Sequence, residues 1–195
     1  MIPFPDKKYN VIYADPPWSY YNDMTVSPEE NHSGLGLMKK VPYPVMSSDD
    51  IAKLPVRDLA AEDCILFIWT TDYHLDRCIN KIIPAWGFQY KTMGFVWQKL
   101  NKSGNPVSFM GAYTLKSGVE LCLLATKGKN ARKLVKKNNV KSLIQSPRLH
   151  HSKKPDEIRQ RIVELVGDIP RIELFARDKF DGWDSWGNQL LGAKK

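Results

Sequence analysis

A short strand that ends at two prolines is predicted by the stretch Tyr9-Asn10-Val11-Ile12-Tyr13-Ala14-Asp15-Pro16-Pro17-Trp18. Its first six residues are mostly aromatic or β-branched, which predicts a strand over 9–14. The two prolines that follow cannot continue a central ladder, because proline has no backbone N–H to donate. The sequence therefore places Asp15 directly at the carboxyl end of a buried strand. In open α/β sheets, ligands bind outside that edge of the sheet.

The rest of the chain alternates short apolar runs with helical patterns, which predicts an α/β sheet with helices on its faces. Further strands are expected over 64–69, 88–97, 120–126 and 172–175. Helical segments are expected after Ser47, over 71–86, from Pro155 to Gly167, and from Asn188 onward. We expect loops over 19–44 and 101–117, and partly helical structure over 127–141. No domain boundary is evident in this pattern, so we expect a single domain over residues 1–195.

The composition favours a polyanionic partner. The chain has 195 residues and a formal net charge of +8, and 43% of its residues are hydrophobic. A basic excess of this kind favours nucleic acid first and anionic membrane surfaces second. The first ten residues lack the apolar core of a signal peptide, and no run approaches about 18 apolar residues, the length of a membrane span. We therefore expect a cytoplasmic protein without a membrane anchor.

The cysteines and histidines do not form a metal-binding pattern. Cys64, Cys78 and Cys122 have no C-x-x-C spacing and lie in or near apolar runs, so we expect reduced, buried thiols. The four histidines form no H-E-x-x-H or Cys/His pairing. We expect no metal site.

The motif Asp15-Pro16-Pro17-Trp18 suits chemistry on an amino group attached to an aromatic ring. Such an amine is a poor nucleophile, because its lone pair is delocalised into the ring. The Asp15 carboxylate and the Pro16 carbonyl could each accept one of its N–H groups, which would localise the lone pair. Pro16 and Pro17 stiffen the backbone that aims this carbonyl, and Trp18 could stack on an extruded base. The alternative interpretation is a proline-rich turn with a surface tryptophan.

These four residues resemble the signature of the adenine-N6 methyltransferases related to the catalytic subunit of the eukaryotic mRNA adenosine methyltransferase. Shorter prokaryotic and phage members of that family share the signature. Other segments resemble the family in the same order along nearly the whole chain: Pro42–Ser47, Leu66–Trp69, Val96–Lys99, Ser152–Glu157, Ile172–Arg177 and Gly187–Leu190. The resemblance implies a doubly wound, Rossmann-like fold that is circularly permuted, so that the catalytic strand precedes the cofactor strand.

The resemblance also implies an activity and a cofactor. A methyl group would pass from S-adenosylmethionine to the N6 amine of an adenine flipped out of DNA. The residues that would bind the cofactor are Asp15, Lys154, Phe175, Arg177, Asn188 and Gln189. Lys154 would meet the methionine carboxylate, Arg177 would face the ribose region, and the two amides would bind the ribose hydroxyls. The alternative role of Asn188 and Gln189 is to cap the last helical segment.

Two further groups of residues would contact the substrate. The base pocket would be lined by Trp18, Tyr43, Trp97 and Lys99, with Glu120 as a weaker candidate and core packing as the alternative for Trp97. Phosphate contacts are expected from one basic stretch, namely Lys129, Arg132, Lys133, Lys136 and Lys137. The alternative for that stretch is a solvated basic surface.

Several alternatives remain open from the sequence. The substrate could be RNA adenosine, or the chain could be a catalytically inactive subunit that binds nucleic acid within a methyltransferase complex. Methylation of cytosine needs similar chemistry, but the tryptophan in the motif favours adenine. The chain could also form a homodimer or a heterodimer.

Overall fold

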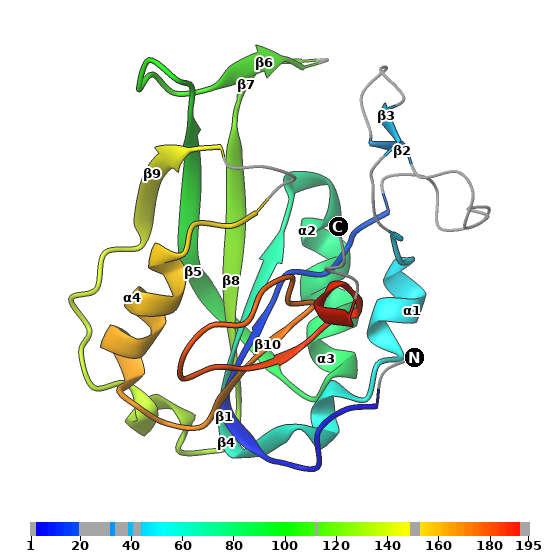
Figure 1. Ribbon diagram of the computed structural model, residues 1–195, viewed down its shortest axis with the longest axis vertical. Helices are drawn as coiled ribbons and strands as arrows, with labels where there is room; N and C mark the ends of the chain where they lie inside the picture. Colours follow the sequence, from blue (N-terminus) through cyan, green and yellow to red (C-terminus); the bar gives the residue numbers. More distant parts are fainter. Residues whose placement is uncertain are drawn as a thin grey trace.

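A seven-stranded sheet forms the centre of the protein (Figure 1). This computed structural model describes residues 3–19, 32–33, 39–40, 44–111, 113–148 and 153–191. The strand order is β11-β10-β1-β4-β8-β5-β9. The bounds of these strands, in chain order, are β1 Tyr9–Ala14, β4 Ala60–Thr70, β5 Gln89–Leu100, β8 Val119–Lys127, β9 Leu143–Pro147, β10 Arg171–Leu174 and β11 Asp184–Trp186. Strand β8 runs antiparallel to both of its neighbours, and the other four pairings are parallel.

Helices cover both faces of the sheet, which confirms the predicted α/β architecture. One face packs against α1 (Ser48–Ala52), α2 (Leu75–Arg77) and α3 (Ile83–Ala85), and the other packs against α4 (Glu157–Val166). Strand β1 is largely apolar because both of its faces are covered. Its Ile12 belongs to the core on the first face, whereas Val11 and Tyr13 belong to the core on the second face.

Most predicted elements are present at the expected places. The predicted strands over 9–14, 64–69, 88–97, 120–126 and 172–175 correspond to β1, β4, β5, β8 and β10. Helix α1 begins after Ser47, whose hydroxyl accepts a hydrogen bond from the Asp50 amide at 3.1 Å. Helix α4 ends at Gly167, which has φ 80°, a conformation that favours glycine.

The helical stretch predicted over 71–86 is less regular than expected. A 3-10 turn at Asp72–His74 leads into α2, and a π-helical turn at Cys78–Ile82 leads into α3. Pro84 explains the irregularity, because it cannot donate a hydrogen bond to the preceding turn and its ring crowds the carbonyl four residues back.

The prediction of a loop over 101–117 was wrong in part. Strands β6 (Ser108–Met110) and β7 (Leu115–Ser117) pair there as an antiparallel hairpin. Strands β9 and β11 were not predicted, and the region 127–141 contains a single 3-10 turn at Ala131–Leu134. Most of the predicted loop over 19–44 lies outside the described residues, apart from the short pair β2 (His32–Ser33) and β3 (Lys39–Lys40).

The three cysteines are buried and free, as predicted. Burial raises the pKa of the Cys64 and Cys78 thiols to about 12, so neither is a reactive thiolate at neutral pH. Within the described part of the chain, no helix is long and apolar enough to cross a membrane.

Candidate active site

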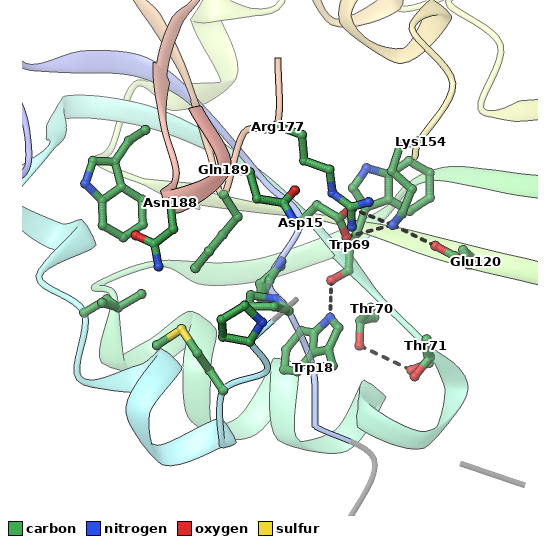
Figure 2. A pocket seen from close by; sticks show the side chains of 17 residues that line it. Asp15, Trp18, Trp69, Thr70, Thr71, Glu120, Lys154, Arg177, Asn188 and Gln189 are labelled. Carbon is green, nitrogen blue, oxygen red and sulfur yellow. Dashed lines mark hydrogen bonds and ion pairs between the residues drawn. The ribbon is translucent and has the colours of Figure 1, made fainter. Parts of the chain in front are cut away.

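A cavity opens where β1, β4 and β10 reach their carboxyl ends (Figure 2). The cavity encloses about 160 Å³. Nine residues singled out from the sequence as catalytic or cofactor-binding line it: Asp15, Pro16, Pro17, Trp18, Lys154, Phe175, Arg177, Asn188 and Gln189. They come from the ends of three strands and from the segment that precedes α4, so the fold gathers residues that are far apart in sequence.

A row of alternating charges forms the floor of the cavity. The Lys154 ammonium donates to both carboxylate oxygens of Asp15, each at 2.7 Å, and lies 3.0 Å from the Glu120 carboxylate. Glu120 also pairs with Lys99. Only 7% of the Lys154 side chain is exposed, and 11% of that of Glu120. Two carboxylates and two ammonium groups therefore compensate each other in a largely water-excluded place, as buried charges require.

These ion pairs shift the pKa values of their members. Burial alone would lower the pKa of Lys154, but the charges of Asp15 and Glu120 hold it above the usual lysine value. Burial alone would raise the pKa of Glu120, but Lys154 and Lys99 hold it below its usual value of 4.5. Lys154 therefore carries its positive charge, and Glu120 its negative charge, across the physiological pH range.

The lowered pKa of Glu120 predicts an acid-sensitive contribution to stability. A carboxyl whose pKa is lower in the folded state contributes stability above its unfolded pKa and loses it as the pH falls through the folded value. The free energy of unfolding of the wild type should therefore exceed that of Glu120→Gln at neutral pH, and the difference should shrink below about pH 4.5. Urea unfolding of both proteins across this range measures it. A difference that does not change with pH would contradict the ion-pair arrangement.

The backbone of the Asp15-Pro16-Pro17-Trp18 segment is held by its own hydrogen bonds. The Pro16 carbonyl accepts from the Trp18 amide at 2.9 Å, and the Pro17 carbonyl accepts from the Met46 amide at 2.8 Å. A carbonyl oxygen has two lone pairs, so Pro16 keeps capacity for a second donor. The segment is thereby fixed against the residues that lead into α1, and Asp15 is held at the cavity.

Trp18 is more deeply buried than a free stacking platform would be. Its side chain is 8% exposed, its indole N–H donates to the Trp69 carbonyl at 3.1 Å, and one face stacks on His74 with ring centroids 4.9 Å apart. Trp18 also lines the cavity. One face of the indole is therefore already covered by His74, which leaves the remaining edge and face as the part that a ligand can reach.

Another part of the cavity wall forms where the residues that follow β10 approach the backbone at the end of β11. Phe175, which follows β10, has φ 61°, an unusual value for a residue other than glycine. The Ala176 amide donates to the Trp186 carbonyl at 3.0 Å, and Phe175 packs edge-on against the Trp186 ring. Phe175, Arg177, Asn188 and Gln189 all line the cavity, and Figure 2 shows the Arg177 side chain extending toward Asp15 and Lys154.

Gly187 makes this approach possible, and its substitution is expected to disturb the site. A Cβ atom at residue 187 would overlap the Ala176 carbonyl oxygen and lie 2.7 Å from the Ala176 nitrogen. We expect Gly187→Ala to destabilise the protein by about 1–3 kcal/mol and to weaken ligand binding in the cavity, because Asn188 and Gln189 must move. Thermal unfolding and a ligand titration measure the two effects. Unchanged stability would contradict the close approach.

The lining residues fit a ligand that carries both charges and hydroxyl groups. The Lys154 ammonium suits a carboxylate and the Asp15 carboxylate suits an ammonium group. The Asn188 and Gln189 amides can each bind paired hydroxyls. The wall also contains apolar side chains that suit a planar ring, namely those of Met46, Leu54, Phe175 and Trp186. S-adenosylmethionine has this combination of groups, so the residues present fit it.

Some of the residues predicted for the base pocket lie elsewhere. Trp97 is 1% exposed and belongs to the core on the α4 face, where its indole N–H donates to the Ser146 carbonyl at 3.3 Å. It does not line the cavity, so core packing, the alternative interpretation, describes it. Lys99 reaches the site only through its ion pair with Glu120. Tyr43 lies outside the described residues.

The basic stretch predicted to bind phosphate begins at the end of the sheet opposite to the cavity. Strand β8 runs antiparallel to β4, with Lys127 beside Cys64 and Leu121 beside Thr70. Residues after Lys127 therefore leave from the amino end of β4, whereas the cavity lies at its carboxyl end. Because β8 reverses the chain direction, the stretch with Lys129, Arg132, Lys133, Lys136 and Lys137 does not adjoin the catalytic residues. Their role in binding phosphate stays a prediction.

Part of this stretch has a structural role. The amides of Lys136 and Lys137 both donate to the Leu165 carbonyl, at 2.7 and 3.1 Å. Leu165 lies in the last turn of α4, whose final carbonyls have no partner within the helix. The stretch therefore supplies hydrogen-bond donors to a carbonyl at the carboxyl end of α4.

Several lining residues were not singled out as site residues from the sequence. Thr70 and Thr71 follow the apolar run of β4, and Trp69 lies at the end of that run. Their position at the carboxyl end of a buried strand was the available signal, as it was for Asp15. Trp186 gave no such signal, because β11 is only three residues long.

Together, a mixed sheet covered by helices on both faces and an ion-paired cavity at its carboxyl edge define an α/β protein with a small-molecule site at the usual place for this architecture. Comparison with known proteins narrows the class. The MT-A70 family matches residues 9–189, and the chain belongs to this family.

The chain is similar to several proteins of known name. It is 38% identical to the Type II methyltransferase M.MunI of a Mycoplasma species, over 95% of this chain and 79% of that protein. It is 28% identical to the mouse N(6)-adenine-specific methyltransferase METTL4 over 95% of this chain. It is 27% identical to the human N(6)-adenosine-methyltransferase catalytic subunit METTL3, again over 95% of this chain. The match spans only 38% of METTL4 and 29% of METTL3.

Proposed function

We propose that this protein transfers a methyl group from S-adenosylmethionine to the N6 amine of adenine in DNA, with the base flipped into the cavity. The observation that carries the proposal is the Asp15 carboxylate, held at the cavity between two prolines and a buried lysine. The names of METTL4 and METTL3, which specify adenine and adenosine N6, support the choice of base. The bound cofactor would supply an electrophilic methyl group on a sulfonium centre.

The residues of the chain would contribute positioning and electrostatics, without a covalent intermediate. Asp15 accepts one N–H of the adenine amine and the free lone pair of the Pro16 carbonyl accepts the other. The nitrogen lone pair then points out of the ring system. A carboxylate offers about four acceptor positions, so Asp15 can bind this N–H while Lys154 remains paired with it.

The remaining residues hold the two reactants in place. Lys154 binds the carboxylate of the cofactor's methionine part, and Asn188 and Gln189 bind its ribose hydroxyls. Arg177 faces the same ribose region. The edge of Trp18 borders the flipped base. Because Lys154 is largely buried with compensating carboxylates, its ammonium group is oriented before any ligand binds.

DNA is preferred over RNA as the substrate because the chain resembles the prokaryotic and phage DNA enzymes of the family. The relative that is 38% identical is a Type II methyltransferase from a Mycoplasma species. RNA adenosine is the second candidate, supported by the adenosine named in METTL3. An inactive subunit is a weaker candidate, because Asp15, Lys154, Asn188 and Gln189 are all present and line one cavity.

One experiment separates these candidates. The protein is incubated with methyl-labelled S-adenosylmethionine and with DNA or RNA oligomers, which are then digested to nucleosides for mass spectrometry. The proposal predicts labelled N6-methyldeoxyadenosine. Labelled N6-methyladenosine alone would assign RNA as the substrate, and absence of label in both samples would support an inactive subunit.

We also propose that the chain is a circularly permuted, single-domain version of the methyltransferase fold. Strand β1 is the first in the chain and carries Asp15, yet it lies in the sheet interior between β10 and β4. Strand β10, which precedes the cofactor-side residues Phe175 and Arg177, comes late in the chain. This order supports a catalytic half that precedes the cofactor half.

A further inference from the structure

A hairpin beside the cavity exposes large apolar side chains. We name it the β6–β7 arm and define it as residues 106–111 and 113–118, which include β6 and β7. Tyr113 is 98% exposed, Met110 82%, Leu115 67% and Phe109 41%. Solvent exposure of one such residue needs no explanation, but four within one short hairpin indicate a contact surface.

The β6–β7 arm grows directly from the strands that carry the charged floor of the cavity. The Val107 amide donates to the Lys99 carbonyl at 2.8 Å, and the Gly118 amide donates to the Val107 carbonyl at 2.7 Å. Lys99 and Glu120 lie just beyond these bonds, in β5 and β8. Figure 1 shows the arm projecting past the ends of β5 and β8. Whatever binds the arm is therefore held on the carboxyl side of the sheet, where the cavity opens.

A second connection ties the arm to the other side of the cavity. Lys116 in β7 donates to the Asp72 carboxylate at 2.6 Å. Asp72 directly follows Thr70 and Thr71, which line the cavity. Tyr73, the next residue, is 51% exposed. The arm thus lies at the rim of the cavity.

The charge of the arm favours an anionic partner. Residues 100–119 contain no aspartate or glutamate, and of their two lysines Lys116 is paired with Asp72 whereas Lys102 is exposed. Besides Lys102, Arg148 is a second exposed basic residue at the base of the arm, where its amide donates to the Leu100 carbonyl at 3.4 Å. Aromatic side chains set among basic residues are the usual composition of surfaces that bind single-stranded or unstacked nucleic acid.

We propose that the β6–β7 arm binds the polynucleotide next to the target base, with Phe109, Met110 and Tyr113 packed on the neighbouring bases and Lys102 near a phosphate. This inference rests on the proposed function and names the surface by which its substrate is held. A flipped base leaves unstacked neighbours, and apolar side chains at that place compensate the loss of stacking. A second protein copy fits less well, because four exposed side chains fall far short of the roughly 20–30 residues a side of a standard protein interface.

The test compares the full-length wild type with the triple variant Phe109→Ala/Met110→Ala/Tyr113→Ala. Binding of a fluorescein-labelled, adenine-containing duplex and of its single strand is measured by anisotropy. The triple variant is expected to bind at least about tenfold more weakly, since stacking on one base contributes about 1–3 kcal/mol. Its affinity for S-adenosylmethionine and its sedimentation coefficient should match those of the wild type. Leu143→Ala is the matched control, since Leu143 is 48% exposed on β9, outside the arm.

The salt dependence of polynucleotide binding tests whether Lys102 lies near a phosphate. Lys102→Gln should reduce the slope of log affinity against log salt by about one, whereas the triple variant should keep the slope of the wild type, because stacking releases no counterions. An unchanged slope for Lys102→Gln would show that Lys102 does not contact the polynucleotide.

Two results would overturn the inference. One is an unchanged polymer affinity in the triple variant. The other is a wild-type dimer that dissociates in the triple variant, which would assign the arm to a second copy of the chain. A wild type that methylates no nucleic acid would instead refute the proposed function, so the two failures are distinguishable.

Discussion

Replacing Lys154 with methionine is expected to lower the free energy of unfolding by about 3–5 kcal/mol, because it leaves buried carboxylates without their cation. Methionine keeps the length and apolar stem of lysine, so the loss reports the charge and not a cavity. The Asp15 and Glu120 carboxylates, which now contact one ammonium group, would face each other across an uncharged side chain. Urea unfolding at neutral pH measures the effect.

The neighbouring lysine provides the control. Lys153 has side-chain exposure of 34% and pairs with the exposed carboxylates of Asp156 and Asp178. Lys153→Met should therefore change stability by less than about 1 kcal/mol. Equal effects in the two variants would contradict the burial of the Lys154 ion pairs. Lys154→Met should also weaken the affinity for S-adenosylmethionine, and an unchanged Kd would remove Lys154 from the cofactor site.

Replacing Asp15 with asparagine is expected to lower the rate of methyl transfer at least about a hundredfold, the usual cost of removing one group that stabilises charge in the transition state. Asparagine keeps the shape of aspartate but presents one acceptor oxygen and an NH₂ group, so it competes poorly for Lys154 and for the amine together. The affinity for the cofactor should fall by a much smaller factor than kcat, and the melting temperature should stay close to that of the wild type. Steady-state kinetics, a cofactor titration and thermal unfolding separate these quantities.

A second aspartate with a lysine partner serves as the control for this variant. Asp184 pairs with Lys7 at 2.7 Å and accepts from the Tyr9 hydroxyl at 2.8 Å, and it does not line the cavity. Asp184→Asn should leave kcat within a few-fold of the wild type. If Asp15→Asn retained full turnover, the carboxylate would have no part in the reaction.

The segments with strong local signals were predicted well from the sequence. The strand before Asp15, the serine cap of α1 and the glycine that ends α4 all follow from the residues themselves. The site roles of Lys154, Asn188 and Gln189 were expected only from the resemblance to the methyltransferase family, and the fold places these residues with Asp15 around one cavity. Carboxyl ends of parallel strands meet at one edge of a sheet, so residues placed there by local rules come together in the fold.

The failures have a common cause in long-range pairing. Strand β11 and the β6–β7 arm have few residues and gain their structure from partners distant in sequence, which no local pattern reveals. The position of the basic stretch relative to the cavity could not be predicted, because it depends on the direction of β8. The sequence 120–126 predicts a strand but does not tell whether it runs parallel or antiparallel. Trp97 was ambiguous for a similar reason, since an apolar residue in a strand fits a cavity wall and a core equally well.

The proposed reaction requires the exocyclic amine of adenine, held by Asp15, as the acceptor of the methyl group. The most direct test offers the wild-type protein two DNA oligomers with labelled S-adenosylmethionine, one with adenine and one in which purine without the amino group replaces every adenine. We expect label on the N6 position of adenine in the first oligomer and none in the second. Label on the purine-substituted strand, or on cytosine in either strand, would contradict it.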